Sequence, residues 1–505
     1  MRKTVLALRP SITGLVLVAA GYAGHVHAEG WRISADAQVR VIQSDNINFS
    51  PTAPSSDTLT EVTPTVSIRR NSPRLKLKAN YSPRLLYYAD DTFDSRMANN
   101  LSADGTLEVV DDLFFLNGRA SITERARSAF NAEPNLANNT VGQTTQSRVF
   151  ALSPSMRGTV RLGDVATWTS NYTIARSDSS TRDDALTTRT LTATLKGAPA
   201  KLGWKADYSS RTADSSTSNN SERDSVVGSL IYRPDVELEL TGRYGYEKTT
   251  LSRRRDGATY GLGVVWTPTP RTSVTFDRDE RPYGSTAKFN LSHRLPRTAF
   301  TAGYSRSIVS SIDTQLENNF QDLYDQIALT EPYASIADPV DRQLAIEADA
   351  RAGRIPGVGA LGTDVLTDSE FLRTRWQLSA VHNGARNTLS LTMYRSTNDS
   401  GTGSGGTLTG DFLLSPVIVQ KGWTVGLSHR LGSISSLNFS LSSYDTSGGR
   451  VTSQQTTRNI FNATYSTALG TRTSGSIGLR MMRGTVTAGD VDENALIATV
   501  NTRFN

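Results

Sequence analysis

The residue types that most often carry catalytic or metal chemistry are sparse in this 505-residue chain, and they do not form groups. The chain has no Cys, and after its first thirty residues the histidines stand at His293, His382 and His429. Transition-metal sites need Cys or His ligands at short, matched spacings, such as two His with three residues between them. Because these histidines are far apart in sequence, we predict no metal site, no catalytic residues and no cofactor.

Two short stretches imitate ligand-binding loops. Residues 401–406 (GTGSGG) satisfy the spacing G-x-G-x-x-G, but a nucleotide site needs a strand before the glycines and a helix after them. Here the glycines lie in a polar stretch, which we interpret as a flexible loop. The acidic run 489–494 lacks the spacing of a calcium loop and is interpreted as a polar hairpin. No G-x-S-x-G nucleophile motif occurs, so an enzyme is only a minor alternative.

The first 28 residues are typical of a secretory signal peptide. Arg2, Lys3 and Arg9 supply a positive start, residues 12–20 form a short apolar stretch, and residues 26–28 (VHA) predict cleavage after Ala28. This segment holds three basic and no acidic side chains, so its removal lowers the formal net charge from +6 to +3. No later apolar stretch is long enough for a transmembrane helix, so a membrane could be crossed only by strands.

From residue 29 onward, apolar and polar side chains alternate with a period of two. Leu75, Leu77 and Ala79 alternate with Lys76 and Lys78, and residues 236–247, 260–266 and 496–504 follow the same rule. Successive side chains of a strand point to opposite faces, so each segment has one apolar and one polar face. A hydrophobic content of only 37% suits a barrel with a wet interior.

Short turns alternate along the chain with longer polar connections. Short turns are expected, for example, at 71–74, 294–297 and 383–387, and longer connections at 44–58, 82–96, 124–145, 178–187, 209–223, 396–419 and 445–457. Outer-membrane barrels combine tight periplasmic turns with long outer loops. We therefore predict an all-β, transmembrane, antiparallel up-and-down β-barrel of about 22 strands (range about 18–24) over residues 29–505. Both termini would be periplasmic, and the location would be the cell outer membrane.

The polar faces of these strands carry charged side chains. A charge on the lipid face near the middle of the bilayer costs about 2–4 kcal/mol, so the alternation assigns such residues to the lumen. Their mixed signs indicate a hydrated wall, and pairing of opposite charges across strands would also fix the register. The predicted lumen-facing residues are Lys76, Lys78, Asp104, Glu108, Arg119, Glu237, Glu239, Arg243, Arg373, Arg375 and Arg430.

Aromatic side chains favour the opposite face. Tryptophan and tyrosine gather at the headgroup level of membranes, although strands also favour aromatic residues in general. Five tryptophans share the apolar parity of their strands and are candidates for an aromatic girdle: Trp168, Trp204, Trp266, Trp376 and Trp423. The final strand ends with Phe504, which resembles the terminal signal read by the barrel-assembly machinery.

Residues 307–370 break the alternation. Leu316, Phe320, Leu323 and Ile327 have helical spacing, and a second helix is predicted to begin at Asp338 and Pro339, run through Arg342 and end at Gly353. The segment holds twelve acidic and three basic residues, a net charge of −9, against about +12 for the rest of the mature chain. Two interpretations stay open: a lid or constriction whose acids face basic wall residues, or a solvated loop on the rim.

Several of these stretches resemble one particular family. They are residues 336–343 (IADPVDRQ) with the following helix to Gly353, the turn 45–47 (DNI), and residues 62–67 (VTPTVS) and 75–83. They are similar to the outer-membrane barrel proteins of PEP-CTERM/exosortase exopolysaccharide loci, over nearly the whole mature chain. The resemblance implies a role in exopolysaccharide secretion or assembly, with exopolysaccharide and a periplasmic polysaccharide-export protein as partners, and it supplies no catalytic residues.

The sequence therefore predicts a non-catalytic conduit or scaffold for exopolysaccharide export. The alternatives are a diffusion porin for small solutes and a structural or adhesive surface barrel. Besides the export partners, the expected contacts are outer-membrane lipid and the barrel-assembly machinery, with no nucleic acid.

Overall fold

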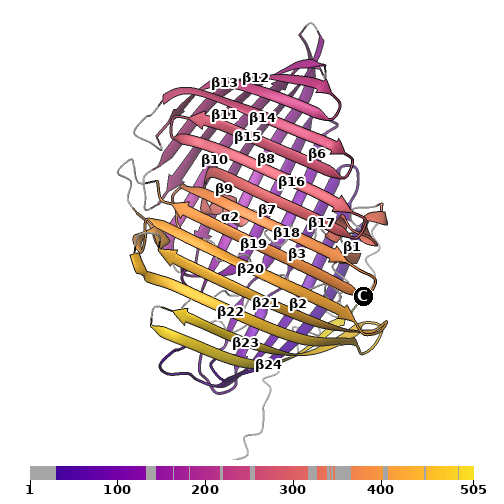
Figure 1. Cartoon of the computed structure of the whole chain (residues 1–505), viewed down its shortest axis with the longest axis vertical. Coiled ribbons are helices and arrows are strands. Elements are labelled where there is room, and N and C mark those ends of the chain that lie inside the picture. Colours follow the sequence, from indigo (N-terminus) through magenta and orange to yellow (C-terminus); the bar gives the residue numbers. More distant parts are fainter. Residues whose placement is uncertain are drawn as a thin grey trace, which may run out of the picture.

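Strands dominate the fold, as shown in a computed structural model of the chain (Figure 1). The structure describes residues 30–131, 144–162, 164–180, 182–198, 200–216, 220–250, 256–316, 327–337, 342, 345–346, 365–401, 408–448, 451–486 and 488–504. The first strands are β1 (Trp31–Ser44), β2 (Asp57–Asn71), β3 (Leu75–Tyr81), β4 (Arg84–Tyr88), β5 (Arg96–Ala98), β6 (Leu101–Val110), β7 (Phe114–Ala126), β8 (Thr144–Leu162), β9 (Asp164–Ser179), β10 (Arg182–Lys196), β11 (Leu202–Ser215) and β12 (Ser221–Asp235).

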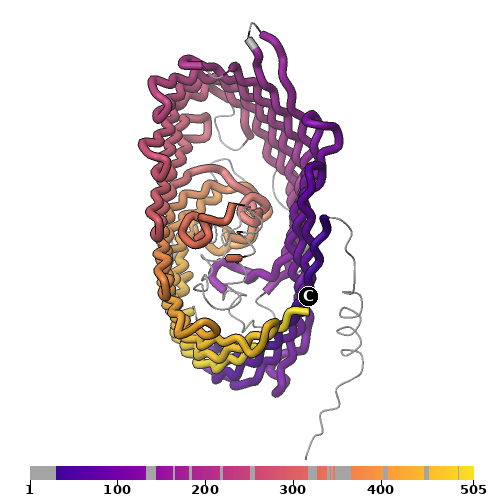
Figure 2. The backbone as a smooth tube through the Cα atoms, turned by 90° about the vertical axis from the view of Figure 1, so that its right-hand side faces the viewer, coloured from indigo at the N-terminus to yellow at the C-terminus, as the bar shows by residue number. Residues whose placement is uncertain are grey.

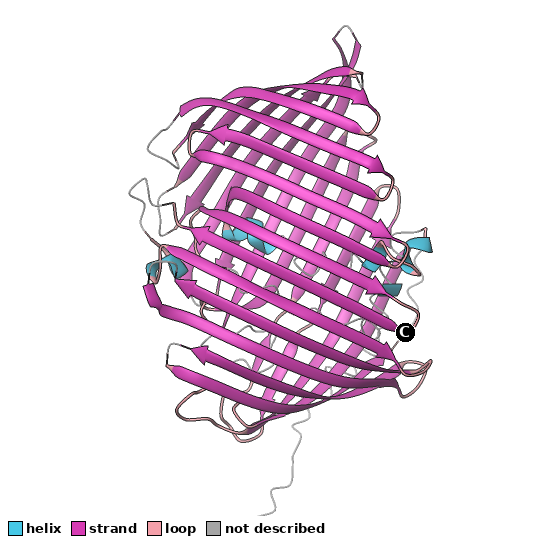
Figure 3. Cartoon of the chain, in the orientation of Figure 1, coloured by secondary structure: helices cyan, strands magenta, loops and turns pink. Residues whose placement is uncertain are grey.

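The remaining strands are β13 (Leu238–Thr249), β14 (Asp256–Thr269), β15 (Thr272–Arg281), β16 (Gly284–Leu295), β17 (Thr298–Val309), β18 (Phe371–Asn383), β19 (Asn387–Asp399), β20 (Val417–Arg430), β21 (Ser435–Gly448), β22 (Val451–Ala468), β23 (Thr473–Val486) and β24 (Gly489–Arg503). The short helices are α2 (Ser311–Leu316), η1 (Tyr333–Ser335) and η3 (Gly410–Leu413), and they stand out against the strands in Figure 3. Among the described residues, no helix has both the length and the apolar character needed to cross a membrane.

These strands form one antiparallel sheet that closes on itself. β1 pairs with β2 on one side and with the last strand, β24, on the other, from Asp36 opposite Arg503 to Ser44 opposite Ala495. β3 and β4 both pair with β2, so these two segments occupy one strand position of the barrel. β6 pairs with β3 and β5 pairs with β4, so β5 and β6 occupy the next position. The 24 segments therefore make a closed barrel of 22 strands. The predicted all-β barrel of about 22 strands is confirmed.

The two faces of the barrel differ in chemistry. On β13 and β14, Tyr244 and Leu262 are 70% and 67% exposed on the outside, while Arg243 and Glu247 point inward and bond to charged residues of β15. An apolar outer face is stable only against hydrocarbon, and the polar inner face keeps its charges in water. The fold thus places its polar chemistry in the lumen.

The two ends of the barrel are also different. The start of β1, the end of β24 and the tight connections, such as those at 71–75 and 295–298, lie at one end, here called the short-turn end. The long connections β1–β2, β7–β8, β17–β18 and β19–β20 lie at the other, here called the long-loop end. Three predicted long connections are shorter than expected, because β9–β12, β21 and β22 extend through most of 178–187, 209–223 and 445–457. Ladder hydrogen bonds continue there although the apolar alternation stops, since those parts of the strands project beyond the apolar belt.

The tryptophans are unevenly placed along the strands. Trp168, Trp204 and Trp266 lie near the short-turn ends of β9, β11 and β14, while Trp376 and Trp423 lie near the middle of β18 and β20. Trp168 covers Gly158 of the neighbouring β8, and Trp204 covers Gly197, which follows β10; an added Cβ at Gly158 or Gly197 would stand 2.7 Å or 2.5 Å from an indole nitrogen. The first three are placed where one interfacial girdle would lie.

Lysine substitutions on the two faces of β14 test the orientation of the wall. We expect Leu262→Lys to lower the folded fraction strongly, because a lysine on the lipid face near mid-bilayer costs about 2–4 kcal/mol. Val265→Lys is the matched control, since Val265 is opposite the inward Glu239 and its lysine would reach the wet lumen. The measurement is the share of heat-modifiable barrel on unheated SDS gels. Equal losses for both variants would contradict the assignment of faces.

Candidate functional site

A cavity of about 1300 Å³ lies in the lumen between opposite walls of the barrel. Strands β6–β9 line one side, β16–β18 line the other, and Gln315, Leu316 and Leu329 of the segment between β17 and β18 close a third side. Most of the lining side chains are hydroxyls, amides and charges: Ser102, Asp104, Thr106, Asn117, Arg119, Ser121, Ser153, Ser155, Asn171, Thr173, Lys288, Asn290, Ser292, Thr301, Ser305, Gln315, Arg373, Arg375 and Gln377. Such a surface holds water and can exchange hydrogen bonds with a polar solute.

A second cavity of about 600 Å³ continues the first toward the short-turn end. The two share the lining residues Thr106, Asn117, Ser155 and Asn171, and the second reaches Pro73 and Arg74 in the turn between β2 and β3. A polar path therefore leads along β6–β9 from the middle of the lumen to the short-turn mouth.

The predicted lumen residues occupy several parts of the wall. Asp104, Arg119, Arg373 and Arg375 line the larger cavity, and Lys76 and Glu108 line the smaller one. Lys78 is opposite Asp104 in the β3–β6 ladder.

The other four lie away from the cavities. Arg243 and Glu239 lie on β13, and Arg430 ends β20 at the short-turn end. Glu237 lies in the turn between β12 and β13. The alternation of side chains along a strand therefore does not assign Glu237 to the lumen.

Most inward charges outside the cavities are paired with neighbours. Arg243 donates to Asp277 (2.7 Å) and Asp279 (2.8 Å), and Arg480 binds Glu493 through two hydrogen bonds (2.7 and 3.1 Å). Such cross-strand pairs satisfy each other and hold the strand register. They leave little free charge on those parts of the wall.

The segment between β17 and β18 enters the lumen rather than resting on the rim (Figure 2). It begins at Ser310, three residues later than the predicted Ser307, because β17 continues to Val309. Its helix α2 packs against β8 and β9, with Ile312 buried among Val149, Ala175, Leu186 and Ala213. Ser147 donates a hydrogen bond of 2.7 Å to Gln315. We call Ser310–Glu370 the insert.

Acidic side chains of the insert meet a basic residue of the wall. Arg211 of β11 donates to Asp313 (2.7 Å) and to Glu370 (2.8 Å) at the two ends of the insert. Glu370, whose side chain is 2% exposed, also accepts from Ser221 at 2.7 Å. One arginine thus fastens both ends of the insert to one wall, and a buried carboxylate would be costly without it.

The middle of the insert lies at the opposite, short-turn end. Glu331 N–H donates to Pro296 O (3.0 Å), and the Asn383 side chain donates to Glu331 O (2.9 Å), both in or beside short turns. Ile327, Tyr333 and Ile346 pack on the inward Val381 of β18. The described parts of the insert therefore contact the wall at both the long-loop end and the short-turn end of the barrel.

The predicted second helix falls mostly outside the described residues. Arg342 is helical and donates twice to Ile336 O, at 2.7 and 3.0 Å. Asp338, Pro339 and Gly353 lie outside the described residues, as do Phe320, Leu323 and Ala28.

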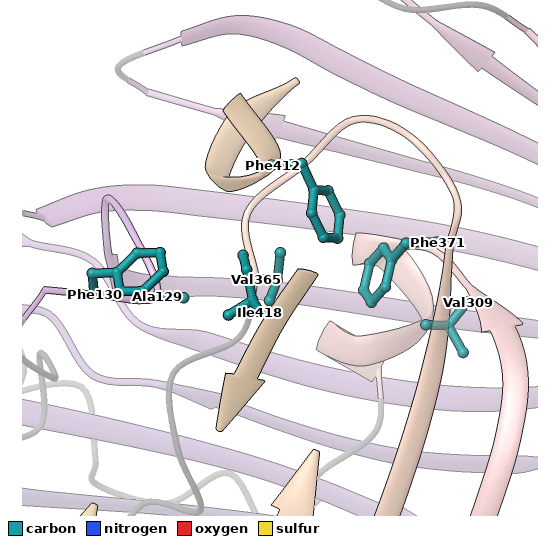
Figure 4. Close-up of a cluster of buried hydrophobic side chains, with 7 residues drawn as sticks. All are labelled: Ala129, Phe130, Val309, Val365, Phe371, Phe412 and Ile418. Carbon is teal, nitrogen blue, oxygen red and sulfur yellow. The ribbon is translucent and has the colours of Figure 1, made fainter. Parts of the chain in front are cut away.

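Loops cover the long-loop mouth. Phe130 and Ala129 of the β7–β8 connection, Val365 of the insert and Phe412 of the β19–β20 connection form one buried cluster with wall residues (Figure 4). Asp411 accepts backbone hydrogen bonds from Ala129 (3.0 Å) and Leu366 (2.9 Å), which ties all three loops together. A separate hollow of about 30 Å³ lies where α2 and residues 366–368 meet β8 and β9. The described polar path leads toward the short-turn mouth, and α2 bounds its other side.

His293, His382 and His429 form hydrogen bonds between adjacent strands near the strand ends. Through Nδ1 they bond to Thr272 (2.9 Å), Thr298 (2.9 Å) and Asn387 (2.6 Å), respectively. Within the described ranges there is no group of three His, Cys, Asp or Glu residues that could hold a metal ion. Residues 402–407, which carry most of the glycine pattern, are outside those ranges.

The class of the protein follows from this geometry. A closed antiparallel barrel with an apolar outer face and a polar lumen is the architecture of outer-membrane transmembrane barrels, and the chain has this architecture. No family model matches the sequence, and no curated protein matches it.

Solved structures with similarity to the chain are distant in sequence. The siderophore receptor PirA from Pseudomonas aeruginosa has 10% identity over 94% of this chain and 81% of that one, with a TM-score of 0.44. The ferric-catecholate import receptor Fiu from E. coli K12 has 8% identity over 94% and 82%, with a TM-score of 0.47. A variant of OccD1 (OprD) has 10% identity over 94% and 97%, with a TM-score of 0.31. The description of the barrel rests on the strand pairing of this chain itself.

Replacing Arg211 tests whether its ion pairs hold the insert in place. In Arg211→Ala, Asp313 and Glu370 lose their shared cation, and we expect single-channel openings in planar bilayers to become several-fold more frequent. Arg243→Ala is the matched control, because Arg243 also binds two carboxylates but contacts only the wall. Identical conductance of both variants would show that the Arg211 pairs do not restrain the insert.

Proposed function

We propose that this protein is an outer-membrane component of exopolysaccharide export or assembly, a conduit without chemistry of its own. One observation carries the proposal: a polar path along β6–β9 that reaches the short-turn mouth and is bounded in the lumen by residues of the insert. A polymer made inside the cell would enter from the periplasmic side, and the short turns of outer-membrane barrels face that side.

The lining of this path suits a saccharide. Side chains such as Asn117, Ser153 and Thr173 offer both donors and acceptors to a chain of hydroxyl groups. Two neighbouring groups on the path already bond to each other, since Ser153 and Thr173 are 2.9 Å apart. A polymer that slides through needs many weak, exchangeable hydrogen bonds rather than one tight pocket, and a hydroxyl- and amide-rich wall supplies them.

The insert would act as the gate of this conduit. Its described parts line the lumen, and its long-loop end is held by ion pairs to Arg211 and by the buried Ile312. Release at that end would move α2 away from β8 and β9 and open the cavity toward the long-loop end. Export components benefit from such closure, because an open pore of this size would leak periplasmic solutes.

A diffusion porin for small solutes is the second candidate. The observation that favours it is the continuity of the two cavities with the short-turn mouth, which would pass small polar molecules if α2 moved only slightly.

As an export component the barrel would work beside a periplasmic polysaccharide-export protein, with the exopolysaccharide as cargo.

Deletion of the gene tests the export role. We expect cell-surface polysaccharide to fall strongly and polymer to accumulate in the periplasm, with both restored by the wild-type gene on a plasmid. The measurement is the polymer content of surface and periplasmic fractions. Unchanged surface polymer would remove this function.

Deletion of residues 312–366 separates a gated conduit from a porin. For a gated conduit the purified wild type should be mostly closed in planar bilayers, and the deletion should create large, stable conductance. A porin should conduct steadily before the deletion. Unchanged conductance after the deletion would contradict the gate.

A further inference from the structure

Two cations of the larger cavity differ from the other inward charges of the barrel. Arg119 of β7 and Lys288 of β16 both line it, from opposite walls, and both side chains are exposed to it. In the described part of the chain, neither side chain has a hydrogen bond or an ion pair. Elsewhere on the wall, Arg243, Arg281 and Arg480 each bind a carboxylate at 2.9 Å or less.

The remaining charges of the cavity do not neutralise these two. Arg373 and Arg375 of β18 line the same space, and Arg375 donates to Gln377 at 3.0 Å, a neutral partner. Among the described residues that line this cavity the acid is Asp104, which is opposite Arg119 in the β6–β7 ladder, and the cations are four. Lys288 is opposite Asp277 in the β15–β16 ladder, but no ion pair joins these two side chains. In a hollow bounded by protein, an excess of positive charge attracts anions more strongly than it would at an open surface.

Several exposed turns at the short-turn mouth carry cations, while the turns at 111–112 and 235–237 carry acids. The cations are Arg74, Arg271, Arg297, Arg386 and Arg472. Arg74 lies at the opening of the smaller cavity, where Lys76, Glu108 and Arg157 also line the wall, and Arg157 is paired with Asp112 at 2.8 Å. An anion that enters by the other turns meets cations at the rim and then those of the larger cavity.

We propose that the larger cavity is a binding site for an acidic polysaccharide, with Arg119 and Lys288 contacting anionic groups from opposite walls. This inference rests on the proposed export function and narrows its cargo to polymers that carry negative charge along the chain. Hydroxyl and amide groups of β6–β9 bind the sugar hydroxyls, while the two cations select the charge. The guanidinium of Arg119 can bind a carboxylate through two hydrogen bonds, and the ammonium of Lys288 acts as a point charge.

The test is binding of a fluorescent oligogalacturonate to the full-length protein in detergent, with a neutral malto-oligosaccharide of equal length as the comparison. We expect the acidic oligomer to bind more tightly, and Arg119→Gln/Lys288→Gln to weaken it by roughly tenfold or more, since two charge-assisted contacts are lost. Raising the salt concentration should weaken the same binding. The charge-conserving variant Arg119→Lys/Lys288→Arg should retain it.

A matched control removes one arginine and one lysine from the inward wall outside both cavities. Arg233→Gln/Lys205→Gln does this, because Arg233 is paired with Glu239 (2.6 Å) and Lys205 with Asp207 (2.9 Å). Heat-modifiable mobility on SDS gels verifies that every variant is folded. An equal loss of affinity in the control would overturn the site, because total lumen charge would then explain the effect.

Two further outcomes would also overturn the inference. They are equal affinity for the acidic and neutral oligomers, and no binding of the acidic oligomer by folded wild-type protein. Neither outcome bears on the export role, which the gene deletion decides independently through surface polymer. Loss of surface polymer on deletion, together with charge-blind binding, would keep the conduit and discard the acidic cargo.

Discussion

The structure depends on the ladder between its first and last strands. In hydrocarbon, each backbone N–H and C=O without a partner costs several kcal/mol, so a sheet with free edges cannot span a membrane. The β1–β24 pairing removes both edges and commits one residue in two to lipid. The other half of the side chains then face a closed, water-filled space. Everything proposed about function, including the polar path, the gate and the acidic cargo, concerns that enclosed half of the sequence.

The insert is held in the lumen by two different kinds of contact. At the short-turn end its anchors are backbone hydrogen bonds around Glu331 and apolar packing on Val381, which are insensitive to charge. At the long-loop end Arg211 bridges Asp313 and Glu370, so that anchor depends on electrostatics and on a single wall residue. An approaching polyanion would compete with these carboxylates for Arg211. Because the two sets of contacts differ, we expect the insert to stay attached at the short-turn end and to be released at the long-loop end when the ion pairs of Arg211 break.

The sequence was sufficient for the barrel but not for the contacts that close it. Period-two alternation predicted the strands, their approximate number and the inward charges, because lipid imposes the same rule on every strand. The net charge of the insert left two interpretations open, acids that face basic wall residues or a solvated loop on the rim, and the pairs of Arg211 with Asp313 and Glu370 are of the first kind. Arg211 itself was missed, because it lies in 209–223, where both faces of the strand are polar and the alternation fades. Its pairing with Asp313 across 102 residues depends on how the insert folds back, which no local pattern encodes. Lys288 had the right parity, but no sequence feature shows that it lacks a partner.

The central claim is that the position of α2 against β8 keeps the lumen closed, and the absence of Cys makes it directly testable. Ser147 and Gln315, whose side chains share a hydrogen bond of 2.7 Å, can be replaced by the only two cysteines and joined by a short cleavable bis-thiol cross-linker. Conductance of this variant should be measured in the Arg211→Ala background, before cross-linking, after it, and after cleavage. We predict frequent openings, then closure, then openings again. Openings of unchanged frequency with the cross-link in place would contradict the account.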